Sequence, residues 1–489
     1  MRVVVIGAGM GGLAAALDLA RQGVAVTVLE RAEAPGGKMR NLSPVPGRPV
    51  GAGPTVFTMR WVFDRLFADA GAVLEDHVTL TQATTLARHA WGQQRLDLYA
   101  DIERSAEAIG AFNGEAAGFR SFAAEARRIY QTLRGPFIEA ARPSPLSLTR
   151  GAGIAAMMGI RPFDTMASAL AKHFRDPRLR QLFGRYATYC GSSPFRAPAT
   201  LMLVAHVEQD GVWLVEGGLH EVAKATVRVL QGQGGQVRYG AEVSSILRRN
   251  GHACGVRLAS GEALDADAVI CNADPAAMAL LGHAPAPASE RSFSAVTWAM
   301  VAEARGFPLL HHTVFFSPDY AAEFAQLARR VPNPATVYIC AQDRPDSEAP
   351  APVGNERLLI LINAPATGDT NKETGPWLDQ TTRFLAQSGL ILIPQASLQT
   401  APPDFERLFP ATGGALYGPA VHGAMASFRR PGARTALPGL YLAGGATHPG
   451  AGVPMAALSG RQAAAALMAD HASIRSSRQT ATRGGISTR

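Results

Sequence analysis

The sequence predicts an α/β fold in which a parallel sheet with crossover helices is interleaved with a second domain of α+β type. Residues 2–30 have the pattern of a strand, a glycine-rich turn, a helix and a second strand. Another glycine-rich segment, at 439–460, begins as a strand and ends as a helix of small residues. The chain of 489 residues is too long for a single core, which predicts two domains.

The N-terminal turn matches a dinucleotide-binding fingerprint. Gly7, Gly9 and Gly12 fit G-x-G-x-x-G directly after the apolar strand MRVVVI, and Gly11 lies inside the motif. We expect Gly7 to make the tight turn, Gly9 to admit a pyrophosphate and Gly12 to let the helix pack on the strand. Glu30 ends the next apolar stretch, at the distance expected of a ribose ligand. These residues predict a Rossmann-like site, the alternative being a glycine turn without a ligand.

Basic residues follow this acid directly. Residues 36–40 read GGKMR, and a glycine pair with basic side chains is unusual at this point of an NAD domain. The segment resembles the G-G-x-x-R extension of the flavoprotein superfamily that includes amine oxidases and carotenoid desaturases. The resemblance implies FAD with Lys38 and Arg40 beside its diphosphate, the alternative being a plain basic turn. The other cofactor-binding candidates around this motif, in a second glycine turn and in a later strand are Arg31, Gly37, Met39, Gly53, Pro54, Thr55 and Val243.

The central sequence divides into helical and strand-rich parts. Residues 100–190 are predicted to be mostly helical, and 234–274 to form strands separated by turns at 250–251 and 260–261. Further strands are expected at 296–301, 314–316, 336–340 and 358–362, and a helix at 377–387. We therefore assign segments 1–75, 200–280 and 426–470 to the nucleotide domain, and 76–199 and 281–425 to a substrate domain. The two domains are expected to meet along a cleft.

Composition excludes several classes of protein. Hydrophobic residues make up 47% and charged residues 18%, as in a well-packed enzyme, and no apolar run reaches the length of a transmembrane helix. The net charge is +8, but four arginines lie in the tail 471–489, which we predict to be disordered. The remaining excess is too small to indicate nucleic-acid binding, although it suits an anionic membrane surface.

No metal or disulfide framework is predicted. The four cysteines are far apart and form no C-x-x-C motif, which indicates free thiols in a reducing compartment. His311 and His312 are adjacent, and neighbours on a strand point to opposite faces, so we expect no metal ion there.

Four longer stretches carry a more specific resemblance. VVVIGAGMGGLAAALDLARQG, LERAEAPGGKMR, VEGGLHEVAKA and LPGLYLAGGATHPGAGVPMAALSGRQAA are similar to the phytoene-desaturase family of bacterial carotenoid desaturases, over residues 1–470. Within the family, VGAGPTVFTMRWVFDRLFADAG and FRDPRLRQLFGRYATYCGSSPFRAPA resemble the 1-hydroxycarotenoid 3,4-desaturases, also called methoxyneurosporene or hydroxyneurosporene dehydrogenases, of phototrophic purple bacteria.

This resemblance implies a function and a site. The activity would be desaturation of the C3–C4 bond of acyclic 1-hydroxy or 1-methoxy carotenoids, with hydride transfer from an allylic carbon to flavin N5 and with a quinone or oxygen as electron acceptor. His448 is the candidate base for the remaining proton; alternatively it only bonds the flavin or the backbone, and water takes the proton. The segment that passes under the flavin ring would contribute Gly444, Gly445, Val453, Pro454 and Met455.

The resemblance also implies a peripheral enzyme on the cytoplasmic face of the bacterial inner membrane, since carotenoids reside in the bilayer. The best membrane-facing candidate is 136–163, where apolar residues are bordered by arginines; the alternative is a lid packed on the substrate domain. Four other functions remain open: a phytoene desaturase, a polyene cis-trans isomerase, a flavin amine oxidase and a carotenoid carrier without catalysis.

Overall fold

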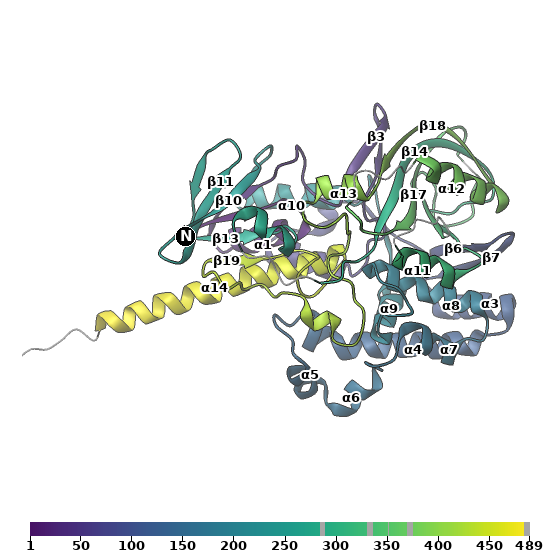
Figure 1. The fold of residues 1–489 in the computed structure, drawn as a ribbon, viewed down its shortest axis with the longest axis horizontal. Helices are drawn as coiled ribbons and strands as arrows, with labels where there is room; N and C mark the ends of the chain where they lie inside the picture. The colour runs from purple at the N-terminus through teal and green to yellow at the C-terminus, as the bar shows by residue number, and fades with distance from the viewer. Residues whose placement is uncertain (284–288, 330–335, 351, 369–374, 484–489) are drawn as a thin grey trace, which may run out of the picture.

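The computed structural model describes residues 1–489 except 284–288, 330–335, 351, 369–374 and 484–489. One part of the molecule surrounds the N-terminus, with helices α1 and α14 beside a small sheet (Figure 1). The other part has a large sheet that contains β14, β17 and β18, above a layer of helices that includes α3, α4, α7, α8 and α9. The functional site lies between these parts.

The first part is built on a parallel sheet of five strands. Their order is β19-β13-β1-β2-β9, and every neighbouring pair is parallel. The strands come from distant parts of the chain: Leu440–Leu442, Ala268–Cys271, Arg2–Ile6, Ala25–Leu29 and Gln236–Arg238. The fold class predicted from the sequence is confirmed by this sheet and by the comparisons given below.

The side chains of β1 alternate between the two faces of the sheet, and both faces are apolar and covered. Val3 and Val5 pack in one apolar cluster with the helices, whereas Val4 and Ile6 pack on the other face. The helical face holds α1 (Met10–Ala20), α10 (His220–Gly232) and the start of α14 (Val453–Arg483). The opposite face is covered by an antiparallel sheet of β10 (Val243–Arg249), β11 (His252–Leu258) and β12 (Ala263–Asp265), as the turn signals predicted.

The second part is built on a mixed sheet of seven strands in the order β18-β14-β17-β16-β15-β6-β7. In that order the strands span Leu390–Thr400, Ser294–Gly306, Glu356–Ala364, Val337–Ala341, His312–Phe315, Thr85–Trp91 and Gln94–Tyr99. Short hairpins and ladders are made by β3 (Asn41–Val45) with β4 (Arg48–Gly51) and by β5 (Leu80–Gln82) with β8 (Trp213–Val215). The associated helices are α11 (Tyr320–Ala328), α12 (Gly375–Gln387) and α13 (Pro402–Leu408).

The helical layer confirms the prediction for residues 100–190. It packs around clustered phenylalanines such as Phe174 and Phe183, whose stacked rings have centroids 4.9 Å apart. Its α-helices are α3 (Ile102–Asn113), α4 (Ala116–Leu133), α5 (Pro145–Ala152), α6 (Ile154–Gly159), α7 (Met166–His173), α8 (Pro177–Gly184) and α9 (Leu203–Asp210). Helix α2 (Trp61–Asp69) lies nearer the N-terminal sheet.

Shorter helical turns connect these elements. They are η1 (Leu74–Asp76), η2 (Arg134–Ile138), η3 (Arg185–Cys190), η4 (Ala199–Met202), η5 (Pro275–Leu281) and η6 (Ala426–Arg429).

The structure differs from the sequence expectation at several boundaries. The hairpin β3–β4 belongs by sequence to the first segment, yet it packs against β14, β17 and β18 of the large sheet. The helix α9 likewise packs mainly on α4, although its Leu203 and Val207 also contact the apolar cluster of the first part. In both places the apolar faces are covered by the second part of the molecule, which sequence order does not reveal.

The tail is the other difference. Residues 471–483, expected to be disordered, continue helix α14, which extends beyond the body of the molecule (Figure 1), and 484–489 lie outside the described residues. The segment 461–483 contains neither Gly nor Pro, so nothing in it interrupts the helix before Gly484. Within the described ranges, no helix has the length and apolarity needed to cross a bilayer.

Candidate functional site

A cavity of about 930 Å³ joins the glycine turns of the parallel sheet to the apolar interior of the second part. At one end it is lined by residues of the N-terminal turn and of 36–40. At the other end it is lined by side chains from η2, α9, the large sheet and the segment 148–162. Its volume lies at the upper end of the range of ligand sites.

The glycine turn is fixed by close backbone contacts. Gly7 has φ +93°, a conformation that suits glycine. A Cβ on Gly12 would lie 2.1 Å from the carbonyl oxygen of Gly7, so α1 packs on the turn only because this residue has no side chain. Gly9 and Gly11 lie on either side of the side-chain amide of Asn272. A Cβ on Gly9 would lie 2.7 Å from its Nδ2, and a Cβ on Gly11 would lie 2.6 Å from its Oδ1. Asn272, at the end of β13, is a site residue that the sequence reasoning missed.

Glu30 lies beside the same turn. Its carboxylate accepts hydrogen bonds from the backbone N–H of Ala8 at 2.7 Å and of Ala32 at 2.9 Å, and its side chain is buried. Each oxygen accepts one bond from the chain and retains a lone pair toward the cavity that Glu30 lines. This arrangement fits the predicted bonding to ribose hydroxyls.

Two cations lie farther along the wall. The ammonium of Lys38 bonds the carbonyl oxygen of Leu416, and burial lowers its pKa to about 8. The guanidinium of Arg40 donates to Thr400 Oγ1 at 2.8 Å, and its pKa is also lowered by burial. A half-buried cation without a carboxylate bonded to it favours an anionic ligand, which fits a diphosphate.

The C-terminal glycine segment forms the facing wall. Gly444 has φ +109° and its Cβ position is 2.8 Å from Asn272 Oδ1, while the first turn of α14 opens into the cavity. Arg430, which the sequence reasoning missed, is buried and donates to the carbonyl of Gly445 at 3.0 Å. The wall therefore presents backbone rather than side chains, which suits a flat ring lying close to it.

The residues predicted to bind the cofactor line this one cavity with one exception, Gly12, whose position is inside the turn. Those that line it are Gly7, Gly9, Gly11, Glu30, Arg31, Gly37, Lys38, Met39, Arg40, Gly53, Pro54, Thr55, Val243, Gly444, Gly445, Val453, Pro454 and Met455.

His448 differs from the expectation of a base facing the substrate. It is buried but lies outside the cavity lining; its Nε2 donates to the carbonyl of Ala140 at 2.8 Å and its ring stacks edge-on against Phe137. Burial lowers its pKa. The geometry fits the alternative in which His448 bonds the backbone, because the neighbouring Pro449, not the imidazole, reaches the cavity.

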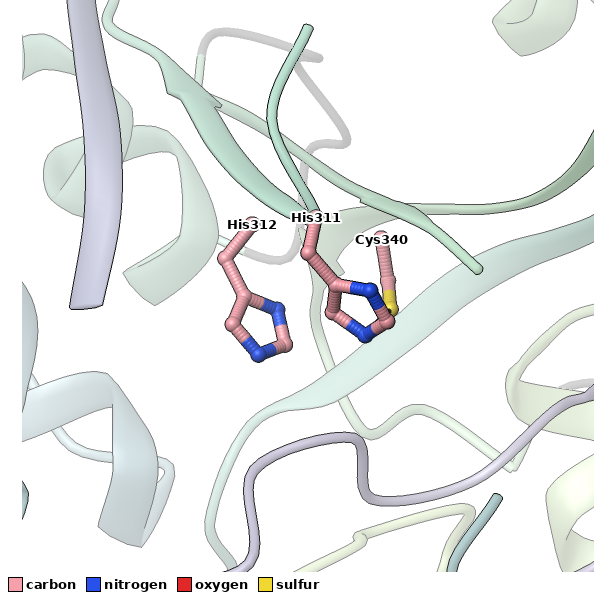
Figure 2. A group of neighbouring side chains, drawn as sticks. All are labelled: His311, His312 and Cys340. Carbon is pink, nitrogen blue, oxygen red and sulfur yellow. Dashed lines mark hydrogen bonds between the residues drawn. The ribbon is translucent and has the colours of Figure 1, made fainter. Parts of the chain in front are cut away.

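The histidine pair also has an unexpected geometry. Because β15 begins at His312, the pair does not alternate as two strand residues would, and the rings lie 4.7 Å apart near Cys340 (Figure 2). The donor atoms of these three residues lie within 4.8 Å of one another. His311 bonds the carbonyl of Arg344 at 2.8 Å and His312 bonds the Tyr338 hydroxyl at 2.7 Å. Burial raises the pKa of Cys340 to about 12 and lowers the pKa of both histidines. All three side chains are therefore uncharged and are held by hydrogen bonds.

A group of polar side chains interrupts the apolar end of the cavity. Arg185, Tyr189 and Glu208 line it together with residues such as Leu203 and Val207. The sequence reasoning missed this group because its members come from η3 and α9 and meet only in the fold.

Comparisons with known proteins agree with this geometry. The model of the flavin containing amine oxidoreductase family matches residues 10–468. The chain is 53% identical to a hydroxyneurosporene desaturase of Rubrivivax gelatinosus, over 100% of this chain and 97% of that protein. It is 48% identical to a hydroxyneurosporene desaturase of Cereibacter sphaeroides, over 96% and 98% of the two chains. A solved structure of putrescine oxidase with putrescine bound is 14% identical and covers 96% of this chain and 99% of its own, with a TM-score of 0.60.

Proposed function

Because the chain belongs to the flavin containing amine oxidoreductase family and, within it, to the carotenoid desaturases, we propose that it is an FAD-dependent desaturase that introduces the C3–C4 double bond into acyclic 1-hydroxy or 1-methoxy carotenoids. The relatives at 53% and 48% identity support the hydroxylated substrate, since hydroxyneurosporene stands in their names. FAD rather than a smaller flavin is supported by the dinucleotide fingerprint at Gly7 and Glu30.

The single observation that carries the proposal is the continuity of the cavity. One space runs from the glycine turn at Gly7 to apolar side chains such as Leu133 and Val314. A dinucleotide bound at the first end and a polyene threaded through the second would meet inside it. A charged amine would have to cross the same apolar lining, which argues against an amine oxidase.

The contribution of the chain is positioning rather than acid–base chemistry. A bound flavin supplies a hydride acceptor at N5, and a second hydrogen leaves the substrate as a proton when the C=C bond forms. The apolar walls contact the polyene along its length and hold the C3–C4 bond in place. Since His448 bonds Ala140, water is the proposed proton acceptor. A quinone or oxygen then takes the two electrons.

A membrane surface is the proposed source of the substrate. Three apolar side chains in the segment 136–163, Leu146, Met158 and Phe163, are 60%, 63% and 81% exposed. Two others, Leu148 and Ile160, are buried and line the cavity. The segment thus combines cavity-lining residues on its inner side with an apolar outer surface, and its helices α5 and α6 lie at the edge of the molecule (Figure 1). We propose that this surface rests on the cytoplasmic face of the inner membrane and admits carotenoids from it.

An anaerobic titration tests the proposal. Addition of 1-hydroxyneurosporene to the flavin-loaded protein should bleach the flavin absorption and yield a polyene with one more double bond. Isomerisation without bleaching would indicate a polyene isomerase, and binding without either change would indicate a carrier. Bleaching by amines alone would indicate an amine oxidase.

A further inference from the structure

We infer that Arg185, Tyr189 and Glu208 bind the terminal hydroxyl group of the carotenoid and determine the preference for hydroxylated over unsubstituted ends. The inference rests on the proposed function, whose substrate carries that hydroxyl at C1. It assigns a role to a polar group that the desaturation chemistry does not require.

The group is a closely bonded cluster. Tyr189 donates its hydroxyl hydrogen to Glu208 at 2.7 Å, and Tyr186 donates to the other carboxylate oxygen at 2.5 Å. Arg185 donates through Nη1 to the Tyr189 oxygen at 2.9 Å. Burial raises the pKa of both tyrosines, so that each keeps its proton and acts as a donor. The contacts tie η3 to α9 across one end of the cavity.

One polar atom of the cluster has no partner within the described part of the chain. The Nε of Arg185 is buried and makes no hydrogen bond there, although the residue is nearly inaccessible to solvent and lines the cavity. Leaving a buried charged donor unpaired is costly. Because Arg185 lines the cavity, an acceptor atom of a bound ligand can form the missing hydrogen bond.

The cluster offers what an alcohol needs. A hydroxyl is both a donor and an acceptor, and here it would accept from Arg185 Nε and donate to the remaining lone pair of Glu208. A methoxy group has only the acceptor and would use Arg185 alone. A hydrocarbon end would leave both polar groups desolvated and unpaired, so the cluster discriminates against it.

The position of the cluster agrees with the bond that reacts. The C1 hydroxyl is only a few bonds from C3 and C4, so its binding site has to lie close to the flavin. Tyr338 bonds Thr55, a predicted flavin neighbour, at 2.6 Å. Tyr338 and Tyr189 pack against the same apolar cluster, and both line the cavity together with Arg185. The cluster and the turn at 51–55 are therefore neighbours around one part of the cavity.

Substrate discrimination is the decisive experiment. The ratio of kcat/KM for 1-hydroxyneurosporene over neurosporene is measured for the wild type and for Glu208→Gln and Tyr189→Phe. We expect a wild-type ratio of about 100 or more, since a site built around a hydroxyl rejects analogues without one. We expect at least a tenfold fall of the ratio in each variant, caused by the loss of activity on the hydroxylated substrate. Tyr130→Phe is the control, because this buried tyrosine of α4 lies outside the cavity lining, and it should leave the ratio unchanged.

Flavin content and carotenoid binding separate the outcomes. Variants that retain full flavin absorption and melt as the wild type does, but keep the wild-type ratio, would overturn the inference and leave the cluster a structural tie. A wild type that uses both polyenes equally well would overturn it too. If Glu208→Gln fails to fold, Tyr189→Phe, which keeps the ring, decides alone. If both variants fail to fold, the ratio of the dissociation constants of the two carotenoids for the wild type, measured by tryptophan quenching, decides. Failure of the wild type to desaturate either polyene would instead refute the proposed function.

Discussion

Substitution of Gly12 by Ala should weaken flavin binding through the backbone of the glycine turn. The added Cβ would lie 2.1 Å from the carbonyl oxygen of Gly7, whereas real Cβ atoms essentially never come within 3.0 Å of another heavy atom. The N-terminus of α1 must therefore move away from the turn by about 0.9 Å, the difference between these distances. Because Leu13 and its neighbours are fully buried, this shift costs about 1–3 kcal/mol of overpacking.

The same shift displaces the N–H groups proposed to bind the diphosphate, so we expect FAD affinity to fall about tenfold or more, the equivalent of ~1.4 kcal/mol. The assay is a flavin titration of the flavin-free protein, together with thermal unfolding. Gly232→Ala is the matched control: it is also a helical glycine, but its Cβ would meet no atom within 4 Å. That variant should be as stable as the wild type or more stable, by up to ~1 kcal/mol. Equal FAD affinity and melting temperature for Gly12→Ala and the wild type would refute the reasoning.

Three further predictions concern the acid, the cation and the exposed surface. Glu30→Ala should lower FAD affinity at least tenfold and reduce stability, because it leaves the N–H groups of Ala8 and Ala32 without their acceptor; unchanged flavin occupancy would contradict this. Burial lowers the pKa of Lys38 from an ordinary 10.5 to about 8, and a bound diphosphate would favour the ammonium, so FAD affinity should be greatest below pH 8 and fall as the pH rises above 8. Lys38→Met should flatten that dependence, and an unaltered slope would count against the assignment. Replacing the three exposed residues of 136–163 by Ser should release the protein from anionic liposomes with its flavin retained, whereas unchanged binding would move the membrane contact elsewhere; they are Leu146, Met158 and Phe163.

The sequence predicts the glycine turn and the position of Glu30 beside it because these signals are local. The contacts of Gly7 and Gly12 and the reach of Glu30 depend on a strand, turn and helix that follow one another in the chain. The same holds for the hairpins at 250–251 and 260–261, where turn residues determine the pairing. In such places the local pattern and the tertiary structure agree.

The substrate end could not be predicted in the same way. Arg185 and Glu208 meet through the packing of η3 against α9, and no spacing in the sequence relates them. His448 is close to the cavity in sequence, yet its imidazole turns to the carbonyl of Ala140, a segment 308 residues away. The strand β18 was missed because it lies at the edge of the sheet with most of its residues exposed or half-buried, and Pro394 follows its apolar start at 390–393.

The central claim is that this cavity holds a flavin and a hydroxylated polyene together. The most direct measurement is to incubate the FAD-loaded protein with 1-hydroxyneurosporene and with phytoene in liposomes and to record the absorption spectra of the products. The account predicts a shift to longer wavelength, by one conjugated double bond, for 1-hydroxyneurosporene and little change for phytoene. Rapid stepwise desaturation of phytoene, with 1-hydroxyneurosporene left unchanged, would contradict it.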